Sequence, residues 1–319
     1  MENATEALNP LQLAAEIRKA VDIRHCIAWV GAGLSRPVYD DWPLAVTKLC
    51  KACGVKDVDE SLPGTKSDQL INKAEECKKA NEETYEATLA EIYGREEVTT
   101  RRAYPWLVKA PFKAYVTTNF DPLLSEAAAV ADHTHLFCYP LLECPDLERY
   151  LKPIFYIHGH ARRNGAPSGK NLVLAQSEFD KAYGDCGVVA LFVQNLLHSY
   201  PIVFIGSSLS EPATYEQIQR VHSMHALIME SRPDYVPRPR LALLPTIIRE
   251  DKSSGPQGKK ERDTGSEQTE VNRFSELETK VLRYHAADPN QHGEIEEVLR
   301  HLCDQPEVAS VISGEEGPK

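Results

Sequence analysis

The sequence has little positive charge and no long apolar run. Its 36 lysines and arginines are outnumbered by 47 aspartates and glutamates, which gives a formal net charge of −11. That balance disfavours direct binding of nucleic acid, because the phosphate backbone attracts a basic surface. The best apolar run, Leu241–Ile248, is far shorter than the ~18 residues of a membrane-spanning helix. We therefore expect no membrane segment and no direct contact with nucleic acid.

Cysteine is sparse, and its spacing suggests no disulfide framework. Eight cysteines are spread over 319 residues, and the first ten residues lack the basic and apolar regions of a secretory signal. Both observations favour a cytoplasmic protein. Cys50 and Cys53 form a CxxC pair, with Cys77 as the nearest further thiol. Three such ligands could hold zinc, but we favour the interpretation that these thiols pack between helices.

The rest of the composition, 42% hydrophobic and 26% charged, is that of an ordinary globular protein. Short apolar runs typical of strands alternate with stretches of helical periodicity, and glycine or polar residues follow the runs. This alternation predicts an α/β fold, a Rossmann-like doubly wound parallel sheet. The predicted strands lie at 26–30, 115–117, 135–139, 153–157, from Leu172, 202–205, 240–244 and 281–286.

Three segments are expected to lie outside this alternation. Residues 67–93 have a helical period and predict two helices that meet near Asn81, so we expect an inserted helical lobe at about 61–110. The stretch 251–269 is polar without an apolar period and predicts a mobile loop. Residues 305–319 predict a flexible tail.

The most informative stretch is CIAWVGAGLSR, at 26–36, in which a strand runs into a glycine turn. Gly31 and Gly33 permit close backbone approach, and Ser35 can cap or start a following helix. A strand, a glycine turn and a helix N-terminus together suit a pyrophosphate. The third glycine of GxGxxG is absent, so a tight turn without a ligand also fits. Trp42, beside the turn, is either a packing anchor or a lid over a ligand.

Polar residues also come directly after other predicted strands. Asn119 and Asp121 lie beyond the second strand, and His158 lies beyond the strand at 153–157. Carboxyl ends of parallel strands meet at one edge of a sheet, where ligands bind. Capping of the next helix, together with Pro122, is enough to explain Asp121, whereas it explains Asn119 less well. A lone histidine is more often structural than catalytic.

Four motifs in this order along the chain resemble those of the sirtuin family: GAGLS at 31–35, TTNFD at 117–121, IHG at 157–159 and GSSLSEP at 206–212. The resemblance covers about residues 10–300 and implies one sirtuin-like NAD-binding and catalytic domain at 10–304. Deacylating sirtuins carry a zinc module with two cysteine pairs after the catalytic histidine. Beyond His158 this chain has only Cys186 and Cys303. It is therefore most similar to the sirtuin-like NAD-cleaving effectors of prokaryotic anti-phage defence.

The resemblance also implies roles for individual residues. His158 matches the general base, and Asn119 is expected to orient the nucleophile. Asp121 lies with Asn119 at the nicotinamide ribose. The remaining cofactor-binding residues fall on the two glycine motifs: Gly31, Ala32, Gly33 and Ser35 on the first, and Gly206, Ser207 and Ser208 on the second.

The activity that the resemblance implies is that of an NAD⁺ glycohydrolase, which releases nicotinamide and ADP-ribose, with NAD⁺ as substrate and with neither a metal nor a separate cofactor. Such a chain would be the toxic effector of an anti-phage system that depletes NAD⁺. It would be controlled as a homo-oligomer or by a separate partner such as an ATPase sensor. Two alternatives remain open. One is a deacylase or ADP-ribosyl transferase that uses the same pocket, and the other is a non-catalytic module that binds NAD or ADP-ribose.

Overall fold

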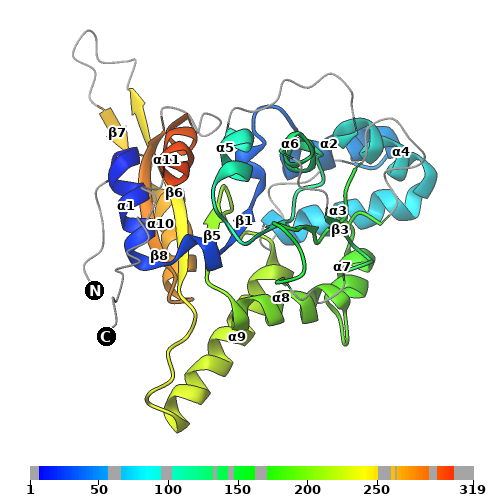
Figure 1. Ribbon diagram of the computed structural model, residues 1–319. Helices are drawn as coiled ribbons and strands as arrows, with labels where there is room; N and C mark the ends of the chain where they lie inside the picture. Colours follow the sequence, from blue (N-terminus) through cyan, green and yellow to red (C-terminus); the bar gives the residue numbers. More distant parts are fainter. Residues whose placement is uncertain are drawn as a thin grey trace, which may run out of the picture.

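The computed structural model describes residues 7–56, 66–94, 103–131, 135–142, 147–161, 171–250, 260–262, 264–286 and 293–304. A central sheet organises these residues, and helices cover both of its faces (Figure 1). Parallel pairing joins strands in the order β3, β4, β2, β1, β5, β6, β8. The predicted Rossmann-like doubly wound α/β fold is thereby confirmed.

The strands of the sheet are short and apolar at its centre. β1 and its two neighbours, β2 and β5, are buried at every position, as expected for a parallel sheet covered on both faces. The bounds are β1 (Ile27–Val30), β2 (Ala114–Thr117), β3 (Leu136–Cys138), β4 (Ile154–Tyr156), β5 (Ile202–Ile205), β6 (Arg240–Glu250) and β8 (Lys280–Ala286). A further strand, β7 (Lys260–Arg262), pairs antiparallel with the end of β6.

Alternate residues of each strand point to opposite faces, so the sheet separates two apolar cores. Ala28 and Val30 pack in one core, and Ile27 and Trp29 pack in the other. Side chains of the first core come from α1 (Pro10–Ala20), α2 (Trp42–Cys53), α3 (Lys66–Ala80), α4 (Glu82–Tyr93), α5 (Ala103–Lys109), α6 (Leu123–Val130) and α11 (Gly293–Cys303). The second core is covered by α7 (Gln176–Tyr183), α8 (Val188–Ser199), α9 (Pro212–Ser231) and α10 (Thr264–Ser275).

Helices α3, α4 and α5 occupy the stretch that we expected to form an inserted helical lobe. Asn81 separates α3 from α4 as predicted, and its side chain caps α4 by accepting from the Thr84 amide at 3.0 Å. The thiols of Cys50 and Cys77 are buried where α2 meets α3, with their sulfurs 3.7 Å apart. This contact supports the packing interpretation. Among the described residues, no three His, Cys, Asp or Glu side chains are grouped in a way that could hold a metal.

Two predicted elements are wrong in detail. No strand forms at Leu172–Ala175, because the amides there have other partners: Val173 donates to the His158 carbonyl, and Leu174 and Ala175 donate to the Glu178 carboxylate. The loop predicted at 251–269 contains β7 and the start of α10. β7 forms because its backbone pairs with β6. The sequence prediction missed it because such pairing does not require an apolar period. Residues 251–259 and the predicted tail at 305–319 lie outside the described residues.

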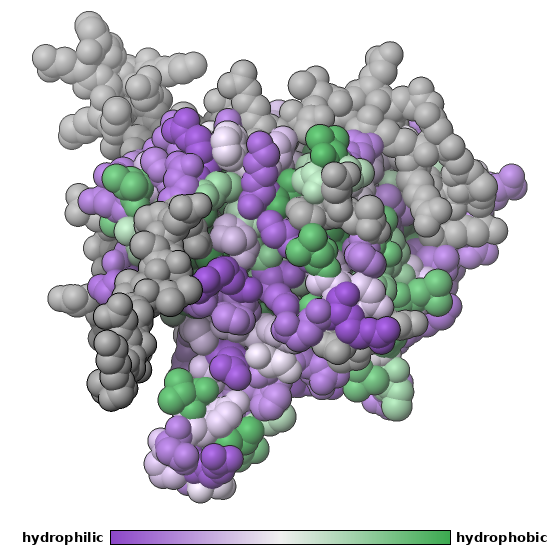
Figure 2. Space-filling model, in the orientation of Figure 1, coloured by the Kyte–Doolittle hydropathy of each residue, from purple (hydrophilic) through white to green (hydrophobic). Residues whose placement is uncertain are grey.

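The surface is mainly hydrophilic on the face that Figure 2 shows, with apolar residues in small separate groups. One such group lies where α9 projects from the body of the molecule, and Leu227, near the end of that helix, is 64% exposed. None of the helices within the described ranges combines the length and the apolar character that a membrane-spanning helix needs.

Candidate functional site

A cavity of about 730 Å³ lies at the carboxyl ends of the central strands. Its walls include all ten residues that the sequence patterns predict for the site: Gly31, Ala32, Gly33, Ser35, Asn119, Asp121, His158, Gly206, Ser207 and Ser208. The topology explains this convergence, because β4, β2, β1 and β5 are parallel neighbours and each precedes one of the motifs. The structure brings the predicted residues together, and their individual roles stay predictions.

The two glycine turns touch each other in the wall of the cavity. The Gly33 amide donates to the Gly206 carbonyl at 2.9 Å, and the Gly31 amide donates to the Ile205 carbonyl at 3.0 Å. A Cβ atom on Gly31 would lie 2.4 Å from the Gly206 oxygen. Gly206 has a φ of +65°, which favours glycine. Glycine is therefore required at Gly31 by the close approach of the two backbones and at Gly206 by its own conformation.

Ser35 does not start a helix, contrary to the prediction. The glycine turn continues into a single 3₁₀ turn, Ala32–Leu34, and α2 begins only at Trp42, capped by Asp41. The Ser35 side chain is buried instead, where it donates to Asp121 Oδ2 at 2.7 Å and lies 2.7 Å from the Tyr104 hydroxyl. The first glycine turn therefore does not lead into the N-terminus of an α-helix, on which the predicted anion site depended.

Asn119 presents one unpaired oxygen in the cavity wall. Its Nδ2 donates to Ser35 Oγ at 3.1 Å and to the Gly31 carbonyl at 3.3 Å, while its own amide donates to Thr117 Oγ1. These bonds fix the orientation of the side chain. Oδ1 is buried and has no hydrogen-bond partner in the described part of the chain. Such an acceptor costs free energy unless a ligand or water donates to it.

Asp121 is a buried carboxyl in the same network. Its Oδ1 accepts from the Leu123 amide at 3.2 Å, so it makes the predicted capping bond, although Pro122 occupies the cap position of α6. Burial raises the pKa of Asp121 to about 6, and the hydrogen bonds from Ser35 and from Leu123 offset part of that rise. The carboxylate is therefore costly to keep ionised.

His158 lies two residues beyond β4 and is buried, with 3% of its surface exposed. Its Nε2 lies 2.6 Å from the Tyr183 hydroxyl, which lies 2.8 Å from Thr214 Oγ1. The Phe179 ring packs edge-on against the imidazole, with the ring centroids 5.5 Å apart. Burial lowers the pKa of His158 to about 3, so the ring is neutral at pH 7.

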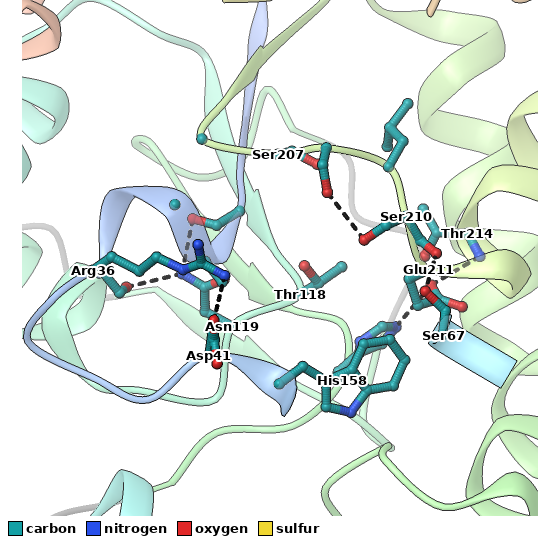
Figure 3. Close-up of a pocket in the computed structure, with 18 of the residues that line it drawn as sticks. Arg36, Asp41, Ser67, Thr118, Asn119, His158, Ser207, Ser210, Glu211 and Thr214 are labelled. Atoms are coloured by element: carbon teal, nitrogen blue, oxygen red, sulfur yellow. Dashed lines mark hydrogen bonds and ion pairs between the residues drawn. The ribbon is translucent and has the colours of Figure 1, made fainter. Parts of the chain in front are cut away.

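Glu211 is a cavity residue that the sequence patterns do not single out. Its carboxylate caps α9 by accepting from the Ala213 and Thr214 amides at 2.6 and 2.9 Å. Oε2 also lies 3.8 Å from His158 Nε2, and Figure 3 shows the two side chains facing each other. Burial raises the pKa of Glu211 to about 7. Pro212 in the GSSLSEP motif signals a helix start, and so a cap at 211, but nothing in the sequence signals the approach to His158.

The comparisons with known proteins agree with part of this picture. Residues 113–254 match the family model described as SIR2-like domain. The match covers less than half of the chain and includes Asn119, Asp121, His158 and the second glycine turn. A search of curated proteins finds no match to the chain.

One solved structure, titled "Structural Basis for the Mechanism and Regulation of Sir2 Enzymes", aligns with 91% of this chain and 97% of its own at 10% identity. Its TM-score is 0.40. A similarity at that TM-score does not establish a relationship between the two proteins. The SIR2-like match therefore rests on the segment 113–254.

Residues outside the SIR2-like segment complete the cavity. Trp42 packs on Phe179 with ring centroids 6.3 Å apart, and its Nε1 is buried without a partner among the described residues. It is therefore both a packing anchor and a part of the cavity wall. Arg36 pairs with Asp41 at 2.7 Å, and Arg273 of α10 donates to the Ser208 carbonyl at 2.8 Å. Both guanidinium groups belong to residues that line the cavity.

Proposed function

We propose that this chain is an NAD⁺ glycohydrolase that releases nicotinamide and ADP-ribose. The observation that carries the proposal is the pairing of a buried, unpartnered Asn119 oxygen with a neutral buried His158 on one cavity. The SIR2-like match of the segment that holds both residues supports it. So does the order of the four sirtuin-like motifs along the chain.

The chemistry of the reaction suits these two side chains. The bond between ribose and nicotinamide breaks with oxocarbenium character, and its electron pair neutralises the cationic ring, so the leaving group needs no acid. Water then needs an orienting acceptor and a base. We assign the first role to Asn119 Oδ1 and the second to His158. The proposal requires neither a metal nor a second cofactor.

The charge of the cavity wall also supports a dinucleotide as the ligand. Its acidic residues suit a cationic nicotinamide ring, and its basic residues suit a pyrophosphate. The acidic residues are Asp40, Asp41, Asp121, Glu211 and Glu270. The basic residues in the described part of the wall are Arg36, Lys66 and Arg273.

We further propose that the enzyme is an effector that depletes NAD⁺ in the cytoplasm during anti-phage defence. Control would come from homo-oligomerisation or from a separate partner such as an ATPase sensor, because an unregulated hydrolase would deplete its own cell. The support for this wider role is the resemblance of the motifs alone.

The test is chromatographic measurement of nicotinamide and ADP-ribose after incubation of NAD⁺ with the purified chain. We expect release by the wild type and a loss of about a hundredfold or more in His158→Ala and Asn119→Ala. His25→Ala is a matched control, because His25 is exposed and its imidazole pairs with Asp22, and neither residue lines the cavity.

Two other outcomes would replace the proposal. Binding of NAD⁺ in calorimetry without any release, alone or with a co-encoded partner, would favour a non-catalytic binding module. Release that requires an acylated peptide would favour a deacylase.

A further inference from the structure

We propose that Glu211 is a positioning residue for His158, which it holds in one tautomer and whose positive charge it balances when the ring takes a proton from water. The inference rests on the proposed NAD⁺ hydrolysis and adds to it a residue from the start of α9. The geometry that points to it is the meeting of Glu211 and Tyr183 at the same imidazole nitrogen. Figure 3 shows Glu211 beside His158.

The first step concerns the tautomer. Nε2 of His158 faces the Tyr183 hydroxyl at 2.6 Å and Glu211 Oε2 at 3.8 Å. A carboxylate at that distance favours a hydrogen on Nε2, which then donates to the Tyr183 oxygen. The Tyr183 hydroxyl in turn donates to Thr214 Oγ1 at 2.8 Å. This arrangement leaves Nδ1 as the nitrogen with the free lone pair.

The second step concerns charge. A base as buried as His158 gains a proton only at a high cost unless an anion lies nearby. Glu211 supplies that anion from the cap of α9. The titratable groups that interact with this carboxyl are His158, beyond β4, at 3.8 Å and, electrostatically, Tyr183 on α7. Lys66 of α3 and Arg273 of α10 line the same cavity.

The proposed step balances in atoms and charge. The water oxygen bonds to C1′ of the ribose as the C1′–N bond breaks, and the electron pair of that bond goes to the nicotinamide ring. One water proton passes to His158 Nδ1. The imidazolium that forms lies beside the Glu211 carboxylate, and the proton later leaves to solvent.

A capping role alone predicts a different result from this pairing. The cap accepts from the Ala213 amide at Oε1 and from the Thr214 amide at Oε2, and the single amide oxygen of a glutamine can still accept from one of them. Glu211→Gln therefore keeps an acceptor and removes the charge. Asn9→Ala is the matched control, since it removes the capping acceptor of α1, which bonds the Gln12 amide at 2.9 Å outside the cavity.

The experiment measures kcat and KM for NAD⁺ between pH 5 and 9, together with thermal unfolding. We expect Glu211→Gln to lower kcat by about tenfold or more, with little change in KM, and to lose the rise in rate that accompanies ionisation of this carboxyl. Glu211→Asp should recover part of the rate, and Asn9→Ala should retain the wild-type kcat. A wild-type kcat and pH profile in Glu211→Gln would overturn the proposal.

A second readout does not depend on turnover. Nitrogen NMR of the His158 ring in the wild type should show the proton on Nε2, and Glu211→Gln should shift the tautomer balance toward Nδ1. If the wild type releases no nicotinamide but shows this shift, the proposed hydrolysis fails and the pairing stands. An identical tautomer in both proteins would overturn the pairing.

Discussion

The two glycine turns have nearly the same sequence and different structures. GAGLS at 31–35 follows β1, and GSSLS at 206–210 follows its parallel neighbour β5. The leucine is buried in both turns, at 2% and 4% exposure. The last serine differs, because Ser35 is buried in a hydrogen-bond network whereas Ser210 is exposed.

The segment after each turn explains the difference. After Ser35 a loop precedes the next helix, so the serine is free to turn inward toward Asp121 and Tyr104. After Ser210 the chain enters α9 at once, with Glu211 as its cap. The first turn thus holds the Asn119 side chain in place through Gly31 and Ser35. The second turn and the cap that follows it place Ser207, Ser208 and Glu211 in the cavity wall.

Among these substitutions, Gly31→Ala should disrupt the contact between the two glycine turns most strongly. The new Cβ would meet the Gly206 oxygen at 2.4 Å and Ser207 Cα at 2.6 Å. Both atoms are backbone, so the turns must separate, and we expect a loss of about 3 kcal/mol in the free energy of unfolding. Urea unfolding measures it. Gly293→Ala is the control, since nothing lies within 4 Å of a Cβ there, and equal stability of the two variants would disprove the interlock.

Asp121→Asn tests, by the pH dependence of stability, the buried carboxyl to which Ser35 of the first turn donates. The pKa of Asp121 rises on folding from 3.8 to about 6, so the folded state holds the proton more tightly. Stability is therefore lost as pH rises from 4 to 6, by up to about 3 kcal/mol. The variant should lack this loss and be more stable than the wild type at pH 7. Denaturation at pH 4 and pH 7 measures the difference, and parallel pH dependence of both proteins would contradict it.

Ser35→Ala should have a smaller effect, of about 1–3 kcal/mol, because it removes hydrogen bonds from buried polar partners. The groups that each lose a hydrogen bond are Asp121 Oδ2, the Tyr104 hydroxyl and Asn119 Nδ2, which keeps its bond to the Gly31 carbonyl. Since Asn119 then loses one of its two anchors, nicotinamide release should also fall. Unchanged stability and an unchanged rate of nicotinamide release would contradict a role of Ser35 in holding Asp121 and Asn119.

Ser207→Ala should have the smallest effect on stability, within about 0.5 kcal/mol, because the residue is partly exposed. Ser207 lines the cavity, so we expect KM for NAD⁺ to rise while kcat changes little. Thermal unfolding together with steady-state kinetics separates the two effects. A destabilisation equal to that of Ser35→Ala would contradict the view that Ser207 contributes to binding and little to stability.

Much of the fold and of the cavity wall could be predicted from the sequence, because both depend on local patterns. Apolar runs with glycine or polar residues after them mark the strand ends, and parallel pairing places those ends at one edge. The prediction that Ser35 caps or starts the following helix is wrong, because a serine after a glycine turn suits both a cap and a buried hydrogen bond. Only the tertiary position of Asp121 and Tyr104 decides between them.

Tyr183 and Glu211 are site residues that the sequence does not reveal. Tyr183 occupies an ordinary helical position on α7, and its contact with His158 arises when α7 packs near the end of β4. Glu211 has a sufficient local explanation as a cap. Neither residue carries a local pattern for the second contact, which depends on segments far apart in the chain.

The hydrogen bond between Gly33 and Gly206 has a consequence for synthesis of the protein on the ribosome. The cavity wall joins an early segment of the chain to a later one, so a nascent chain that ends before Gly206 lacks more than a third of the residues in that wall. Long-range pairing of this kind forms only after both strands are available. A hydrolase built in this way would stay inert until its synthesis is well advanced, so that an unfinished chain would spare the NAD⁺ of the cell that makes it.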